Sequence, residues 1–113
     1  MTQTAEKREN QRIPLDTPVS YSLNGIVWYD TRSVNINYTG MLLRAEESLM
    51  PGQLLHLVFR LPNVHRDEII ETKGEVIRIA TRRSKQVGVA VHFMYLHPAH
   101  QKVIQKFINR VSR

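Results

Sequence analysis

Apolar and polar residues alternate along much of the chain, and this alternation predicts β-strands. In residues 19–23, Val19, Tyr21 and Leu23 alternate with serines, which is the period-two pattern of a strand with one buried face. Segments 54–61 and 86–94 repeat the pattern with apolar side chains on one face: Leu55, Leu57, Phe59 and Leu61, and Val87, Val89, Val91 and Phe93. We expect each segment to lay that face on a hydrophobic core.

The remaining strands are predicted mainly from composition. Residues 26–38 are rich in β-branched and aromatic side chains, so we expect one long strand there. Another strand resumes after Gly40, and one spans residues 69–81, with Gly74 expected at a bulge or kink. An Asn-Gly pair at 24–25 is a hairpin signal. About six short strands joined by short turns predict a six-stranded antiparallel β-barrel, closed or nearly closed, which hides its sheet edges.

The pattern changes to a helical period near the end of the sequence. The apolar residues there recur at helical spacing: Val103, Ile104, Phe107, Ile108 and Val111. Pro98 fits the first helical position, where a missing N–H costs nothing. We therefore expect a helix over residues 97–112 that covers an end or side of a barrel formed by 15–95. Residues 1–14 are mostly polar and charged and are expected to form a flexible basic arm of this single domain of 113 residues.

Composition narrows the classes of function. The chain has no cysteine, which excludes disulfides, zinc–thiolate sites and thiol nucleophiles. Its net charge of +6 and its pI of about 10.1 favour an anionic partner. No apolar run reaches membrane-spanning length and no export signal opens the sequence, so we expect no membrane insertion and a cytoplasmic location.

Two arginines in the basic arm are candidates for anion binding. Arg8 and Arg12 are four residues apart, and Pro14 disfavours helical geometry at the residue before it. In an extended arm the two guanidinium groups can reach one ligand from different directions. Arginine offers a planar fork of donors that fits phosphate oxygens and the O6 and N7 acceptors of guanine.

A second candidate cluster lies in the predicted 26–38 strand. Asn35 and Asn37 are two residues apart, so on a strand they point to the same side. An amide offers donors and an acceptor, which suits the hydrogen-bonding edge of guanine. Gly40, three residues later, can take a positive φ or let a ligand approach the backbone closely.

Together, in this order, these motifs resemble the PilZ domain family. That family's paired signature is R-x-x-x-R followed by D/N-x-S-x-x-G, which here correspond to Arg8–Arg12 and Asn35–Gly40. The segments RIPLDTPVSY, GMLLRA, PGQLLHLVFRLP and GEVIRI are also similar to family members. The resemblance implies a six-stranded antiparallel barrel with a C-terminal helix. It also implies a receptor and adaptor for cyclic di-GMP, a bacterial second messenger with two guanines and two phosphates.

The resemblance also implies roles for individual residues. Arg8 and Arg12 would clasp phosphate and guanine surfaces as the arm folds over the ligand. Asn35, Asn37 and Gly40 would line the guanine-facing edge of the barrel, although Asn37 stands where the family has serine.

Two further residues complete the predicted site. Lys7, just before the motif, would add a contact. Arg78 lies near a position where some relatives carry an aromatic, so it either stacks on a base or is a plain surface charge. The resemblance implies cyclic di-GMP as ligand, no other cofactor or metal, and an unidentified downstream protein partner.

Two other functions remain open, and an enzyme is not expected. No Ser-His-Asp arrangement or carboxylate pair stands out among the residues. His97 and His100 are three apart without an evident third metal ligand, so we expect a capping or solvated role for them. A nucleic-acid-binding barrel suits the charge, but aromatic residues form no obvious stacking row. The third interpretation is a PilZ-like protein-interaction module that has lost its ligand.

Overall fold

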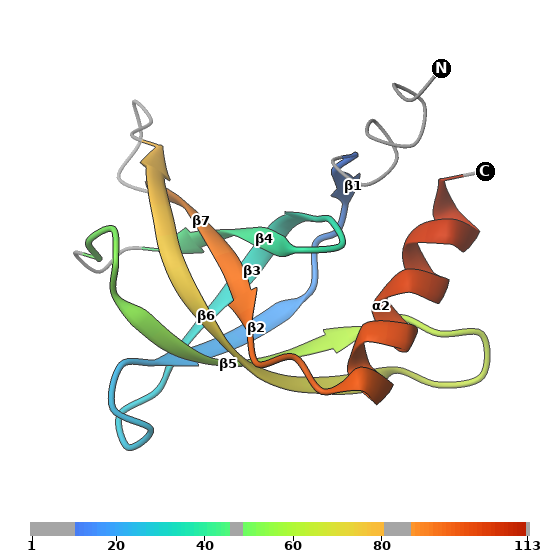
Figure 1. Cartoon of the computed structure of the whole chain (residues 1–113), viewed down its shortest axis with the longest axis horizontal. Helices are drawn as coiled ribbons and strands as arrows, with labels where there is room; N and C mark the ends of the chain where they lie inside the picture. The colour runs from blue at the N-terminus through green and yellow to red at the C-terminus, as the bar shows by residue number, and fades with distance from the viewer. Residues whose placement is uncertain (1–10, 46–48, 81–86, 113) are drawn as a thin grey trace.

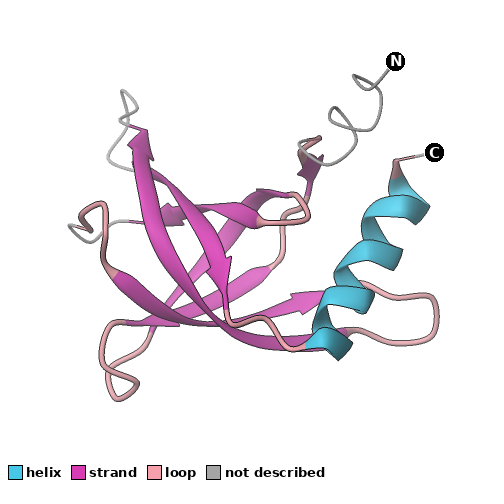
Figure 2. Cartoon of the chain, in the orientation of Figure 1, coloured by secondary structure: helices cyan, strands magenta, loops and turns pink. Residues whose placement is uncertain are grey.

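The computed structural model describes residues 11–45, 49–80 and 87–112, and the side chains of Ala80 and Val87 are left out of the description. The predicted residues Lys7 and Arg8 lie outside the described residues. Seven strands and one helix are described (Figures 1 and 2): β1 (Ile13–Pro14), β2 (Pro18–Ser22), β3 (Tyr29–Ile36), β4 (Gly40–Ala45), β5 (Leu54–Leu61), β6 (Glu68–Ala80), β7 (Val87–Met94) and α2 (Pro98–Val111). The first strand lies within the segment that was predicted to be a flexible arm.

The strands form one antiparallel sheet that closes on itself. Its order is β1-β3-β2-β5-β6-β7-β4, and an additional pairing between β3 and β4 joins the two ends. Six strands therefore make a closed barrel, while the short β1 pairs with β3 beyond the end of β2. The predicted six-stranded antiparallel barrel is confirmed.

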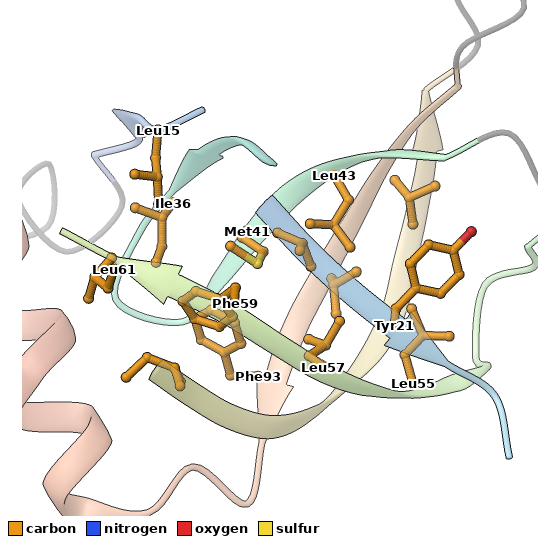
Figure 3. Close-up of a cluster of buried hydrophobic side chains, with 14 of the residues drawn as sticks. Leu15, Tyr21, Ile36, Met41, Leu43, Leu55, Leu57, Phe59, Leu61 and Phe93 are labelled. Atoms are coloured by element: carbon orange, nitrogen blue, oxygen red, sulfur yellow. The ribbon is translucent and has the colours of Figure 1, made fainter. Parts of the chain in front are cut away.

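Alternating side chains of the strands fill the barrel, as the sequence pattern predicts. Along β5, the residues Leu55, Leu57, Phe59 and Leu61 are all buried. Figure 3 shows the rings of Phe59 and Phe93 close together in this core, and their centroids are 5.9 Å apart in a stacked arrangement. The core is continuous, because β1 and α2 add apolar residues to the same buried cluster.

Gly74 lies in a regular part of β6, contrary to the expected bulge or kink. The register shift of β6 against β7 falls between Val76 and Arg78. Gly74 pairs in register with Leu55 and Phe93. A Cβ at this position would lie 2.2 Å from Val91 Cγ1, so the glycine leaves room for core side chains.

The strand predicted over residues 26–38 is shorter at both ends. β3 begins at Tyr29, and the residues before it form a loop. Asn24 Oδ1 accepts hydrogen bonds from the backbone N–H groups of Ile26 and Val27, at 2.8 and 2.9 Å. These N–H groups are satisfied locally, so β-propensity does not extend the ladder through them.

Helix α2 was predicted within one residue of its observed bounds. Pro98 occupies the first turn, and the His97 Nδ1 atom accepts a hydrogen bond from Ala99 N at 3.1 Å. The helix buries Ile104, Phe107 and Ile108 against the barrel core. Figure 1 shows α2 beside the loop that joins β5 to β6. No helix among the described residues is long and apolar enough to cross a membrane.

Candidate functional site

The structure brings the second arginine of the first motif to the second motif. Arg12 Nη1 donates a hydrogen bond to Asn35 Oδ1 at 2.9 Å. Twenty-three residues separate the two in sequence, and pairing of β1 with β3 closes this distance: Pro14 lies opposite Asn35. The Arg12 side chain is exposed and Asn35 is half-buried, so both remain accessible from outside the barrel.

A short irregular segment between β1 and β2 fixes this arrangement. Ser33 on β3 accepts a hydrogen bond from Thr17 N at 3.1 Å and donates one to Leu15 O. Leu15 N in turn donates to Val34 O at 3.0 Å. Because the segment is tied to β3 on the inside and Leu15 is buried, residues 12–14 are held along β3.

An exposed ion pair ties the same segment down from outside. Arg32 Nε lies 2.6 Å from Asp16 Oδ1, and Arg32 Nη2 donates to Asp16 O at 3.1 Å. The hydrogen bond from Arg32 holds the pKa of the Asp16 carboxyl below its usual value of 3.8. Arg32 is therefore occupied by a protein carboxylate, whereas Arg12 is bonded to a neutral amide.

Asn37 closes a turn instead of lying on the strand beside Asn35. β3 ends at Ile36, and Asn37 Oδ1 accepts hydrogen bonds from Thr39 N and Gly40 N at 3.0 and 2.8 Å. The Thr39 hydroxyl also donates to this oxygen at 3.2 Å. Asn37 is 7% exposed. The prediction that Asn35 and Asn37 share one strand face is wrong, because the amide oxygen satisfies turn N–H groups that a continued strand would pair elsewhere.

Gly40 allows a close backbone approach, but the neighbour is β7. A Cβ at Gly40 would lie 2.2 Å from the carbonyl oxygen of Val91. The described glycines with positive φ are Gly25 and Gly52, so Gly40 does not use the left-handed region. The close approach at Gly40 is that of β7, which joins the turn to the barrel, and the predicted approach of a ligand stays a prediction.

Arg78 lies in the same cross-strand row as Asn35. Asn35 pairs with Leu42 of β4, Leu42 pairs with Ala90 of β7, and Ala90 pairs with Arg78 of β6. Directly paired residues share a face of a sheet, and the core neighbours Leu43 and Val89 point inward, so this row faces outward. We call Asn35, Leu42, Ala90 and Arg78 the outer row. Three inter-strand steps of about 4.8 Å make it roughly 14 Å long.

Sequence reasoning missed one cation on this face. Arg44 is exposed and lies two residues beyond Leu42 on β4, opposite Gly88 of β7. Alternation along GMLLRA is the signal that would have placed Leu42 and Arg44 on one face. The outer face thus carries arginines at three places, Arg12, Arg44 and Arg78, around the small residues of β7.

A cavity of about 300 Å³ lies next to the turn at residues 37–40. Its walls come from that turn, the end of β7, the following loop and helix α2. The lining residues are Tyr38, Thr39, His92, Phe93, Tyr95, Leu96, Gln101 and Gln105. Sequence reasoning did not find this cavity. The one available signal was the spacing of Gln101 and Gln105, one helical turn apart on the polar side of α2.

The histidines do not form a metal centre within the described residues. No group of three or more His, Cys, Asp or Glu side chains gathers there. The His97 and His100 rings lie 5.9 Å apart, centroid to centroid, at the start of α2. Since His97 Nδ1 accepts the Ala99 N–H, the predicted capping role of this residue is confirmed.

Known structures share this fold. The chain is similar to the inhibitor of motility MotI/DgrA of Bacillus subtilis, with a TM-score of 0.81 and 22% identity over 89% of this chain and 49% of that chain. It is also similar to the PilZ domain of YcgR from Escherichia coli, solved with c-di-GMP, with a TM-score of 0.69 and 13% identity over 92% of both chains.

A longer YcgR structure, in complex with c-di-GMP, matches with a TM-score of 0.74 and 15% identity over 90% of this chain and 44% of that chain. The chain therefore spans about half the length of MotI/DgrA and of the longer YcgR chain. No curated protein matches the sequence. The sequence itself matches the PilZ domain over residues 6–110, which is most of its length. This chain belongs to the PilZ domain family.

Proposed function

We propose that this protein binds cyclic di-GMP on the outer row and signals the bound state to a partner protein in the cytoplasm. The observation that carries the proposal is the hydrogen bond from Arg12 to Asn35, because it joins the two motifs on one outward face. YcgR, which has this fold, was solved in complex with c-di-GMP. The net charge of +6 favours a dianionic ligand.

Each end of the outer row offers a different contact. The Arg12 guanidinium has five N–H donors and uses one on Asn35, so the others can donate to a phosphate or to guanine O6 and N7. The Asn35 amide nitrogen can donate to the same base while its oxygen accepts from Arg12. At the other end, Arg78 is exposed and presents a planar cation to a base or a phosphate.

The middle of the outer row is apolar, which suits a guanine ring lying flat on the sheet. Leu42 is half-buried, whereas Ala90 is 1% exposed and covered by its neighbours, so Leu42 supplies the apolar surface that is open to a ring. Asn37 and Gly40 act indirectly in this proposal, by holding the turn that follows Asn35. The proposal keeps Lys7 and Arg8, which lie outside the described residues, as ligand contacts, and closure of residues 1–14 over the ligand would change the surface that a partner meets.

Isothermal titration calorimetry with cyclic di-GMP tests the proposal. Each charge-assisted hydrogen bond contributes roughly 1.5–3 kcal/mol, so we expect Arg12→Ala to weaken binding by about 10- to 100-fold. Arg66→Ala removes the same charge from the exposed loop between β5 and β6 and serves as the control. We expect the control to bind like the parent protein.

Two outcomes would redirect the assignment. Absence of binding by the parent protein at high concentration would favour the interaction module without ligand. If Arg12→Ala and Arg66→Ala lower the affinity for cyclic di-GMP equally, then net charge, and not the Arg12–Asn35 site, attracts the nucleotide.

A further inference from the structure

The cavity beside the turn has a hydrogen-bonding lining that is poor in charged residues. None of its eight lining residues is Asp, Glu, Lys or Arg, although the whole chain carries 16 Lys and Arg residues. Gln101 and Gln105 of α2 supply amides, and Thr39 supplies a hydroxyl. Tyr38, Phe93 and Tyr95 supply aromatic surface. His92 is the one lining residue that can carry a positive charge, and the amides and hydroxyls around it match the donors and acceptors of a neutral polar ring.

Tyr95, at the edge of this cavity, has an unfavourable backbone conformation. Its φ is +56°, and it is the sole non-glycine residue with positive φ among the described residues. The residue is 82% exposed, so burial of the ring in the core does not compensate for the conformation. Glycine or asparagine adopts this backbone conformation at lower cost. An exposed aromatic kept in a left-handed conformation beside a cavity indicates a function for the ring.

We propose that this cavity binds a nucleobase, with its ring stacked on Tyr95 and its polar edge hydrogen-bonded by Gln101 and Gln105. Bases of every kind stack on aromatic side chains, and amide side chains match their mixed donors and acceptors. The choice of a nucleobase, among neutral rings, rests on the proposed function. The cavity itself does not, because none of its lining residues belongs to the outer row.

The cavity and the outer row are close enough to be linked. Thr39 lines the cavity and is bonded through Asn37 Oδ1 into the turn that follows Asn35. Gly40 and Leu42 lie two residues apart on β4, a separation of about 7 Å along a strand. The base can therefore come from either of two sources, the cyclic dinucleotide on the outer row or a separate nucleoside.

Titration by NMR and calorimetry with two kinds of probe tests the proposal on the full chain. The probes are free nucleosides (guanosine and adenosine) and cyclic di-GMP. We expect Tyr95→Gly to weaken binding of the base about tenfold or more, since it removes the stacking surface. The same variant relieves the left-handed strain, so its thermal stability should be equal to or higher than that of the parent. Gln105→Ala should weaken binding less, and Lys102→Ala, exposed on the same helix and absent from the lining, should leave it unchanged.

The outcomes separate the sources. Tyr95-dependent binding of cyclic di-GMP assigns the base to the dinucleotide. Nucleoside binding that depends on Tyr95, with cyclic di-GMP unaffected, assigns a separate nucleoside. The proposal is overturned if Tyr95→Gly leaves the binding of both probes unchanged, or if neither probe binds the parent protein.

The two proposals fail independently. If cyclic di-GMP binding requires Arg12 but ignores Tyr95, and no nucleoside binds, the proposed function stands and the cavity proposal falls. If nucleosides bind through Tyr95 and cyclic di-GMP does not bind, the reverse holds.

Discussion

Asn37 belongs to the second sequence motif, but its side chain hydrogen-bonds the backbone of a turn. Its amide oxygen accepts three hydrogen bonds, two from Thr39 and one from Gly40, and closes the turn between β3 and β4. A serine hydroxyl oxygen can also accept N–H bonds from a turn, which explains how an asparagine fits at a position where the family has serine. The role of Asn37 in ligand binding stays a prediction, and spacing alone could not show that its oxygen accepts from the backbone.

We expect Asn37→Ala to lower the free energy of unfolding by about 1–3 kcal/mol, because it leaves the buried Gly40 N–H and the part-buried Thr39 N–H without their acceptor. Urea denaturation measures this loss. Asn24→Ala is the matched control, since Asn24 closes an exposed turn on another loop, and it should cost less. A stable Asn37→Ala protein with lost nucleotide affinity would contradict the structural role and assign Asn37 a direct ligand contact.

The sequence predicted Arg12 and Asn35 as site residues but did not predict that their side chains are in contact. Both residues were predicted for the site from their chemistry and from the family resemblance. Their proximity depends on β1, a strand of two residues with no alternation long enough to detect. A pattern of period two needs several residues to stand out, so the contact that joins the motifs became visible only with the fold.

At the scale of elements, two glycines show different reasons for lacking a side chain. A Cβ at Gly40 meets the backbone oxygen of Val91, whereas a Cβ at Gly74 meets the side chains of Val91 and Leu57. A backbone oxygen in a paired strand cannot move without breaking the ladder, but a side chain can be shortened. The two positions therefore predict different responses to a second mutation.

We expect Val91→Ala to rescue Gly74→Ala and not Gly40→Ala. Double-mutant cycles, with stability measured by denaturation, test this. The coupling free energy should be at least about 1 kcal/mol for Gly74 with Val91 and below about 0.5 kcal/mol for Gly40 with Val91. Gly40→Ala alone should cost several kcal/mol, in the range that marks a specific steric clash. A fully stable Gly40→Ala protein would show that β4 and β7 are not in close contact at this point.

The ion pair between Asp16, which precedes β2, and Arg32 on β3 predicts that the stability of the fold depends on pH. The folded pKa of Asp16 is lowered by its hydrogen bond to Arg32, so its contribution to stability is present above the usual value of 3.8. That contribution is lost as pH falls through the lowered folded pKa. We expect Asp16→Asn to lose less stability than the parent as pH falls below about 4.

Acid titration of unfolding, followed by circular dichroism, measures this difference. Asp67→Asn, on the exposed loop between β5 and β6, controls for the loss of one negative charge. Identical acid profiles for Asp16→Asn and the parent would show that the ion pair adds nothing in solution.

At the scale of the whole molecule, alternation predicted the barrel because nearly every strand has one buried face. The length of β3 was predicted less well. Asn24 and Asn37, at its two ends, use side-chain oxygens to satisfy backbone N–H groups, and β-propensity does not register this competition. The cavity beside α2 could not be predicted from the sequence either. Three separate segments line it, and their relative placement depends on the closed barrel.

Net charge leads to a prediction that separates a cyclic dinucleotide receptor from a nucleic-acid-binding barrel. A ligand with two phosphates should give a slope of log affinity against log salt no steeper than about −1.4, using about −0.7 per neutralised phosphate. Titrations with cyclic di-GMP and with a long single-stranded DNA at several salt concentrations provide the comparison. Tight DNA binding with a slope several times steeper, and no binding of the dinucleotide, would favour the nucleic-acid interpretation.

The central claim is that cyclic di-GMP lies across the outer row from Asn35 to Arg78. Amide chemical shifts recorded by NMR during a titration with cyclic di-GMP test it most directly. We predict the largest changes at Asn35, Leu42, Ala90 and Arg78, together with Arg12. Changes confined to the other outer face of the barrel, around Ser20 on β2 and Val58 on β5, would contradict the claim.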